Sequence, residues 1–154
     1  MLKNISSFQN PLIKKVLLLQ EKAKERKKSS LFIIEGKREI KLALKGGYKI
    51  NTLLFCSDII SENDASNFLN TDVNNLIEIS IEVYKKIAYR TSTEGIIAIS
   101  ESKDLSLSKL KLKYHNQLIL VAEAPEKPGN IGAILRTADA ANVDAVIIAN
   151  PKTD

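Results

Sequence analysis

The residues best suited to chemistry lie between Pro125 and Asp139, where two glycines precede a stretch with helical character. Gly129 and Gly132 permit close backbone approach, and the free N–H groups at a helix start can hold a phosphate or another anion. Asn130 is expected to cap this helix. Arg136, about two turns further on, could bind a phosphate or a sugar through its guanidinium. The simpler alternatives are a tight connection between elements and an ordinary surface charge.

Several kinds of site are disfavoured by what the chain lacks. The glycines form neither a Walker loop nor a Gly-x-Gly-x-x-Gly dinucleotide fingerprint. Cys56 is the only cysteine, so no intrachain disulfide can form, and its apolar neighbours predict a buried core thiol rather than a nucleophile. His115 is the only histidine, which argues against a His-based metal site or a Ser-His-Asp triad, and we expect no metal.

The charge of the chain is concentrated at its N-terminal end. Residues 1–50 carry 13 Lys and Arg against 4 Glu, whereas residues 51–154 carry 10 against 14 acidic residues, which together give the net charge of +5. A basic front predicts contact with a polyanion, and a solvated helix face rich in Lys is the alternative. No apolar span long enough for a membrane helix appears, so we expect a cytoplasmic protein with no membrane partner.

The first hundred residues alternate between helical and strand patterns. Asn10 and Pro11 predict a helix start, with Leu12, Val16 and Leu19 on its apolar face and a charged continuation that frays. The remaining elements are expected as strands at 31–35, 52–56, 76–79 and 95–99 and helices at 37–45, from Ser61 through Leu69, and at 81–89. This order predicts a small α/β sandwich of about 100 residues.

The C-terminal part reads as a single β-α-β unit. Residues 101–116 are polar and predict a linker or short connecting helix. They are followed by a buried strand at 118–122, a helix from about Asn130 to Ala141 and a second buried strand at 143–149. One such unit cannot cover both faces of a parallel sheet, so this domain is expected to be truncated. Either the rest of the sheet comes from sequence that is not present here, or this half-domain packs against something else.

Three motifs of this chain resemble those of the SpoU/TrmH RNA ribose 2′-O-methyltransferases of the SPOUT superfamily, and they follow one another along the chain as they do in that family. The first signature motif of that family matches residues 128–139, Pro-Gly-Asn-Ile-Gly-Ala-Ile-Leu-Arg-Thr-Ala-Asp. Residues 32–40, Phe-Ile-Ile-Glu-Gly-Lys-Arg-Glu-Ile, and 91–98, Thr-Ser-Thr-Glu-Gly-Ile-Ile-Ala, match the substrate-binding domain that many members carry in front. Essentially the whole chain is covered.

The resemblance implies two domains. The first, 1–105, would be an RNA substrate-binding domain with the fold of certain ribosomal proteins. A linker at 106–116 would lead to residues 117–154, the N-terminal part of an α/β methyltransferase domain that ends in a deep trefoil knot. The family transfers methyl from S-adenosylmethionine to a ribose 2′-hydroxyl of rRNA or tRNA and forms homodimers. The knot and cofactor pocket are expected beyond residue 154, so this polypeptide alone should neither bind the cofactor well nor catalyse transfer.

The resemblance also assigns candidate residues. Asn130 and Arg136 match the functional Asn and Arg of the motif. Because a guanidinium is effectively always protonated, Arg136 is better suited to hold a phosphate or stabilise a developing alkoxide than to act as a base. Asn130 is 240° from Arg136 around an ideal helix, so it is expected to shape the helix start. Candidate RNA contacts are Lys14, Lys15, Lys22, Lys24, Lys37 and Arg38.

One departure and two alternatives accompany this interpretation. Asn142 stands where the family usually has Gly, and Asn tolerates the left-handed backbone that such a position needs. A non-catalytic RNA-binding module related to ribosomal proteins is the main alternative hypothesis. A protein-interaction domain with a basic patch is a weaker one.

Overall fold

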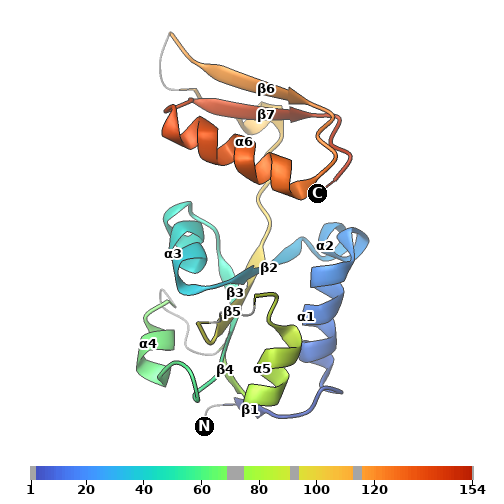
Figure 1. The fold of residues 1–154 in the computed structure, drawn as a ribbon, viewed down its shortest axis with the longest axis vertical. Helices are drawn as coiled ribbons and strands as arrows, with labels where there is room; N and C mark the ends of the chain where they lie inside the picture. The colour runs from blue at the N-terminus through green and yellow to red at the C-terminus, as the bar shows by residue number, and fades with distance from the viewer. Residues whose placement is uncertain (1–2, 69–74, 91–93, 113–115, 154) are drawn as a thin grey trace. The chain divides into compact units, whose positions relative to one another are not determined.

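The computed structural model describes residues 3–68, 75–90, 94–112 and 116–153. The chain divides into two compact units, Met1–Lys103 and Asp104–Asp154. His115 and residues 91–93 of the third motif lie outside the described residues. The two units differ in how completely they bury their apolar side chains, and each is described by itself (Figure 1).

Unit 1 is built on a five-stranded sheet with the order β1-β4-β3-β5-β2. Its strands are β1 (Lys3–Ile5), β2 (Leu31–Glu35), β3 (Ile50–Phe55), β4 (Leu76–Ile79) and β5 (Ile96–Glu101). β1, β4 and β3 are parallel to one another, whereas β5 runs antiparallel to both of its neighbours, β3 and β2. The last strand of the unit in sequence therefore lies between two earlier strands.

Helices cover both faces of this sheet, so the unit is a three-layer α/β sandwich (Figure 1). α1 (Pro11–Glu21), α2 (Ala23–Ser29) and α5 (Ile81–Ile87) lie on one side, and α3 (Lys37–Lys45) and α4 (Glu62–Ser66) on the other. Alternation along the strands supplies both cores. In β3, Leu54 belongs to the core under α1 and α5, whereas Leu53 and Phe55 belong to the core under α3 and α4. The predicted α/β sandwich is confirmed.

The helices of unit 1 begin where capping residues occur in the sequence. The Asn10 side chain accepts the N–H of Leu12 at 2.9 Å, and Pro11 occupies the first helical position. Ser61 and Ser80 cap α4 and α5 in the same way, through the N–H groups of Asp64 and Val83. These side chains satisfy donors that a helix start otherwise leaves unpaired. All three predicted helix starts are confirmed.

Some predicted details of unit 1 are wrong. β1 was not expected, because three residues with one apolar side chain carry no strand pattern. Ile13, not Leu12, is the fully buried residue of the first turn of α1, and Leu12 packs at the edge of the core. The charged continuation does not fray but forms α2 after an extended residue, Lys22. α5 ends at Ile87 rather than at Tyr89, because Ala88 is extended.

Unit 2 contains the predicted β-α-β arrangement. A short 3-10 helix, η2 (Leu107–Lys109), precedes β6 (Ile119–Glu123), α6 (Pro128–Ala140) and β7 (Ala145–Ala149). β6 and β7 are parallel neighbours in register from Ile119 with Ala145 to Glu123 with Ala149. Among residues 104–112 and 116–153, Ala138 alone is fully buried. The prediction that both strands are buried is therefore wrong for this unit as it stands.

Two further observations concern the described part of the chain as a whole. No helix in it combines the length and the apolar character needed to cross a bilayer. The same residues contain no group of three His, Cys, Asp or Glu side chains placed to hold a metal ion.

Candidate active-site segment and nucleic-acid interface

The start of α6 differs from the sequence expectation. Lys127 is the N-cap residue and makes no side-chain capping bond, and Pro128 occupies the first helical position. Proline suits that position because its backbone angle is already helical and it has no N–H to satisfy. The helix therefore begins two residues earlier than expected, and Asn130 is its third residue rather than its cap. The backbone N–H of Asn130 donates to the carbonyl of Lys127 at 3.0 Å.

Arg136 lies on the exposed surface of α6, and its guanidinium lies against Gly132. A methyl group at Gly132 would lie 3.4 Å from Nη1 of Arg136. Because Gly132 is one helical turn before Arg136, the side chain extends toward the N-terminal end of α6. A methyl group at Gly129 would have no neighbour within 4 Å. The first turn of α6 is therefore open to an approaching group, on the side toward which the guanidinium extends.

The carboxyl ends of β6 and β7 are joined near this helix start. The N–H of Ala124 donates to the carbonyl of Ala149 at 2.8 Å, and Asn150 Nδ2 donates to Glu123 Oε1 at 2.9 Å. The N–H of Lys152 donates to the carbonyl of Pro125 at 3.1 Å. In open α/β sheets, ligands bind outside the carboxyl ends of the strands. The first turn of α6, which contains Gly129, begins at the corresponding edge of this unit, and the Arg136 guanidinium extends back in its direction.

Asn142 has the left-handed backbone that was expected at this position. Its φ is +52°. Its N–H donates to the carbonyl of Asp139, and that of Val143 donates to the carbonyl of Ala138. These bonds end α6 and engage Val143, so β7 begins at Ala145 rather than at the predicted Val143. The Asn-for-Gly departure is therefore compatible with the turn.

In unit 1, the two motifs assigned to the substrate domain meet at one end of the sheet. The N–H of Gly36 donates to the carbonyl of Ile96 at 3.3 Å, and the N–H of Lys37 donates to Glu94 Oε2 at 2.5 Å. Gly36 has a φ of +102°, and a methyl group there would lie 2.5 Å from a carboxylate oxygen of Glu39. The positive φ favours glycine at this position, and any side chain there would also have to displace the Glu39 carboxylate.

The same end of the sheet holds residues 89 and 90 in place. Glu35 accepts the backbone N–H of Tyr89 at 2.7 Å and that of Arg90 at 3.2 Å. Arg90 Nη2 also donates to Glu39 Oε1 at 2.9 Å. This hydrogen bond and the charge of Glu39 raise the pKa of Arg90. Two carboxylates thus fix both the backbone and the guanidinium of Arg90.

The pKa of Glu39 reflects opposing effects. Desolvation is the largest single influence and raises it, but the backbone N–H of Glu39, the Arg90 guanidinium and the charge of Arg38 together lower the pKa below its ordinary value. The ionised carboxylate is therefore the favoured form in the folded protein.

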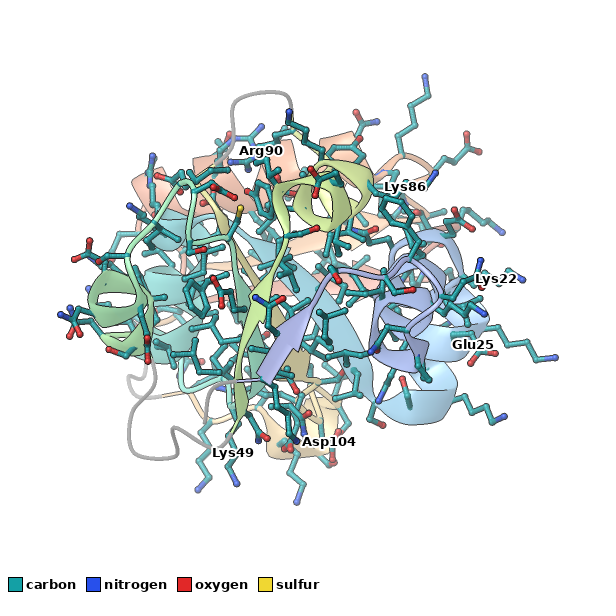
Figure 2. The ribbon with its side chains drawn as sticks, turned by 90° about the horizontal axis from the view of Figure 1, so that it is seen from below. Lys22, Glu25, Lys49, Lys86, Arg90 and Asp104 are labelled. Carbon is teal, nitrogen blue, oxygen red and sulfur yellow. The ribbon has the colours of Figure 1, made fainter. Side chains whose placement is uncertain are left out.

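The six lysines and arginines expected to contact RNA do not lie on one helical layer. Lys14 and Lys15 are on α1, Lys22 lies between α1 and α2, and Lys24 is on α2. Lys37 and Arg38 open α3, in the opposite layer. Four further residues were not predicted as RNA contacts but are exposed at or after the last turn of α5: Lys85, Lys86, Tyr89 and Arg90. Figure 2 shows Lys86 and Arg90 apart from one another, on the two sides of α5. Adjacent cations at the end of a helix were the available signal.

Cys56 is a buried thiol, as expected. It is fully buried in the core under α1 and α5. Burial raises the pKa of the thiol, and the nearby Asp58 carboxylate adds to that effect while its backbone N–H opposes it. A neutral, inaccessible thiol is a poor nucleophile.

Comparison with known proteins assigns the chain to a family. Residues 10–98 match the MRM3-like substrate binding domain, and residues 117–154 match the SpoU rRNA Methylase family. The chain belongs to the SpoU/TrmH family. The first match covers most of unit 1, and the second includes β6, α6 and β7. The resemblance on which the sequence interpretation rested is confirmed.

Individual relatives of this SpoU/TrmH chain are named as RNA methyltransferases. The 23S rRNA (guanosine(2553)-2′-O)-methyltransferase RlmP of Bacillus subtilis is 28% identical over 99% of the chain and 57% of its own length. A crystal structure of an RNA 2′-O ribose methyltransferase is 37% identical with a TM-score of 0.75, over 95% of this chain and 55% of that one. An AdoMet-bound rRNA methyltransferase from Sinorhizobium meliloti is 25% identical with a TM-score of 0.80, over 99% of this chain and 56% of that one. The chain spans about half the length of the curated relatives it matches.

S-adenosylmethionine is the cofactor of the SpoU/TrmH family. An adenosine-sized ligand is normally enclosed by a mostly apolar pocket. In residues 116–153, only Ala138 is fully buried, and Leu118 and Val121 are 57% and 62% exposed. The residues described for unit 2 therefore do not form such an enclosure by themselves.

Proposed function

We propose that this chain acts in RNA ribose 2′-O-methylation, with residues 1–105 binding the RNA and residues 117–154 contributing Arg136 to the reaction site. Residues 106–116 would serve as the linker. The proposal draws on the family assignment and on relatives named as 2′-O-methyltransferases. The observation that carries it is the Arg136 guanidinium, which extends over Gly132 toward the open first turn of α6.

Arg136 has a defined chemical task in this proposal. When a ribose 2′-hydroxyl becomes methylated, its oxygen loses a proton and passes through a state with alkoxide character. A guanidinium can stabilise that developing charge or hold the adjacent phosphate through two parallel N–H bonds. It is a poor proton acceptor because it stays protonated at neutral pH. The proton must therefore leave to another group, and Arg136 orients and stabilises the oxygen.

Asn130 has a different role in the same proposal. It is the third residue of α6, six positions before Arg136, and no hydrogen bond joins the two side chains in the described part of unit 2. We assign Asn130 to shaping the helix start on which an anionic group would lie. The homodimer and the cytoplasmic location remain predictions.

The experiment replaces Arg136 by Ala in the chromosomal gene of the source organism and maps 2′-O-methylated riboses in rRNA and tRNA. We expect one modified position to lose its methyl group, whereas Arg136→Lys should retain part of it because the charge remains without the bidentate geometry. In a filter-binding assay, the affinity of the Arg136→Ala protein for RNA should stay close to that of wild type. A methylation pattern identical to wild type would refute the assignment of Arg136.

A non-catalytic RNA-binding module is the second candidate, and the exposure of the apolar residues of β6 favours it. The same mapping experiment separates the two. Deleting the gene would then remove no methyl group from any RNA, although the protein would still bind RNA.

A further inference from the structure

The two helical layers of unit 1 differ strongly in charge. The stretches 11–29 and 81–90, which contain α1, α2 and α5 with the two residues after its cap, carry ten Lys and Arg against three Glu. The helices α3 and α4 of the opposite layer carry four Lys and Arg against three acidic residues. The net charges are +7 and +1. We call residues 11–29 and 81–90 the basic layer.

The basic layer is held together by contacts between its helices. α1 and α5 pack on the same core, and Gln20 Nε2 donates to the carbonyl of Ile87 at 2.6 Å. Arg26 Nη1 donates to the carbonyl of Leu19 at 2.7 Å, which fastens α2 to the end of α1. The ends of all three helices are thus joined to one another, whereas the lysines of the layer remain exposed: Lys14, Lys15, Lys22, Lys24, Lys27, Lys28, Lys85 and Lys86. Fixed helices with exposed ammonium groups suit a phosphate backbone.

The lysines of the opposite layer are fewer, and one has an internal partner. Lys41 Nζ lies 5.6 Å from the centre of the Phe68 ring, within range of a cation–π contact. Glu62 and Asp64 open α4 in the same layer and would repel phosphates. This layer is therefore the poorer surface for a polyanion.

Tyr89 adds a feature that charge alone does not explain. It follows the C-cap of α5 and is 90% exposed, the highest exposure among the large apolar and aromatic side chains of the described residues. Its backbone is nevertheless fixed, because Glu35 accepts its N–H and that of Arg90. An aromatic ring on an anchored backbone beside cations has the properties of a stacking platform for an unpaired base.

We propose that the basic layer is the RNA-docking face of unit 1 and that Tyr89 stacks on an unpaired base of the bound RNA. This inference rests on the proposed function, because it takes RNA as the ligand. The phosphates of the RNA lie along the exposed lysines of α1, α2 and α5, and the unpaired base reaches beyond the end of α5. Lys85 and Lys86 connect the two kinds of contact, since they occupy the last turn of the helix that leads to Tyr89.

The test measures binding of the full chain to a fluorescein-labelled RNA hairpin with an unpaired loop, and to a fully paired RNA duplex, by fluorescence anisotropy. Tyr89→Ala should weaken binding to the hairpin by about 5- to 150-fold, the loss of one base stack. It should leave the duplex affinity unchanged. Tyr89→Phe should bind the hairpin like wild type, because the ring is retained. Because the Tyr89 side chain is exposed, the thermal unfolding midpoints of both Tyr89 variants should equal that of the wild-type protein.

The charge contribution is tested with two matched double variants. Lys85→Gln with Lys86→Gln should reduce the slope of log affinity against log salt by about 2 for both RNAs. Lys41→Gln with Lys45→Gln removes the same charge from α3 and should leave that slope unchanged. Circular dichroism of both variants should match that of wild type.

The outcomes separate the inference from the proposed function. If the wild-type chain binds neither RNA, RNA binding by unit 1 and the inference both fall. If it binds RNA but the α3 variant loses affinity and the α5 variant does not, only the docking face is wrong. If Tyr89→Ala weakens binding to the hairpin and to the duplex equally, or weakens binding to neither, the stacking assignment is wrong.

Discussion

Units 1 and 2 both contain parallel strands with a helix between them, yet they bury their apolar residues to very different degrees. In unit 1, residues of α1, α3, α4 and α5 and of strands β2 to β5 form two cores, and Leu53, Leu54 and Ile97 are fully buried. In unit 2, Val121 of β6 and Leu118, which precedes β6, remain more than half exposed. The strands of unit 2 are nevertheless at least as rich in apolar residues as those of unit 1. Burial is therefore a property of the layers available to cover a strand, not of the strand itself.

The difference also concerns how the turns are made. Among the described residues, unit 1 has glycine at three of its four left-handed positions, Gly36, Gly47 and Gly95, and the exposed Ser30 at the fourth. At Gly95 the side chain of Ile59 leaves no space for a methyl group. Unit 2 has Ala124, Asn142 and Asn150 at its left-handed positions. Close packing around a turn requires glycine, whereas an open position such as Ser30, or those of unit 2, can keep a side chain there. Turn chemistry and packing density thus vary together in this chain.

The largest expected difference between the units follows from removing one leucine from each. Leu54→Ala should destabilise unit 1 by about 2–5 kcal/mol, because it leaves a cavity in a closed core. Leu120→Ala should cost unit 2 less than about 1.5 kcal/mol, since Leu120 is only half-buried. Hydrogen exchange measured by mass spectrometry reports the opening free energy of each unit separately. Equal costs would show that unit 2 has a core as complete as that of unit 1.

A second pair of variants addresses the turns. Gly95 has a φ of +73°, and a methyl group there would lie 2.7 Å from Cβ of Ile59, so Gly95→Ala should cost about 2–4 kcal/mol. Ala124 has a φ of +48°, and Ala124→Gly should be neutral or stabilise unit 2 by up to about 1 kcal/mol. Hydrogen exchange of the two units is again the measurement. A stabilising Gly95→Ala would contradict the link between close packing and glycine.

The smallest expected effects come from polar contacts, for which the units should be nearly equal. A double-mutant cycle of Glu39→Gln and Arg90→Gln should give a coupling of about 0.2–1 kcal/mol, because both side chains are substantially exposed. Glu123→Ala, which removes the acceptor of Asn150, should cost less than about 1 kcal/mol. A coupling of several kcal/mol would mean that the ion pair, and not the core, distinguishes unit 1.

The Glu39–Arg90 pair should also depend on pH in a defined direction. The pKa of Glu39 is lowered on folding from its ordinary value of 4.5. The stabilisation is therefore present above pH 4.5 and is lost as the pH falls below it toward the lowered value, where the folded protein also binds the proton. Repeating the cycle across this window checks the sign.

Much of the order of elements could be predicted from local signals. Pro11, Ser61 and Ser80 mark helix starts because the capping interaction involves residues only a few positions apart. The helix Lys37–Lys45 was predicted with the observed bounds, since Gly46 and Gly47 follow it directly. β1 was not predicted, because its pairing with β4 depends on residues more than 70 positions away.

The candidate site shows the same limit. The motif containing Arg136 was recognisable, but its contact with Gly132 depends on a side-chain conformation that spacing does not specify. The six expected RNA contacts were chosen by charge, and charge does not reveal that α1 and α3 cover opposite faces of the sheet. The anchoring of Tyr89 by Glu35 joins residues 54 positions apart. No local pattern reports such a contact.

The central place of β5 has a consequence for how the protein is made in the cell. A chain leaves the ribosome from its N-terminus, and domains generally fold as units during synthesis. β2 pairs only with β5, and β3 has β5 as one of its two neighbours, so neither strand is fully paired until residues 96–101 have emerged. Until then, the nascent chain exposes the apolar faces of strands that later form both cores. The closure of the sheet of unit 1 should therefore be a single late event.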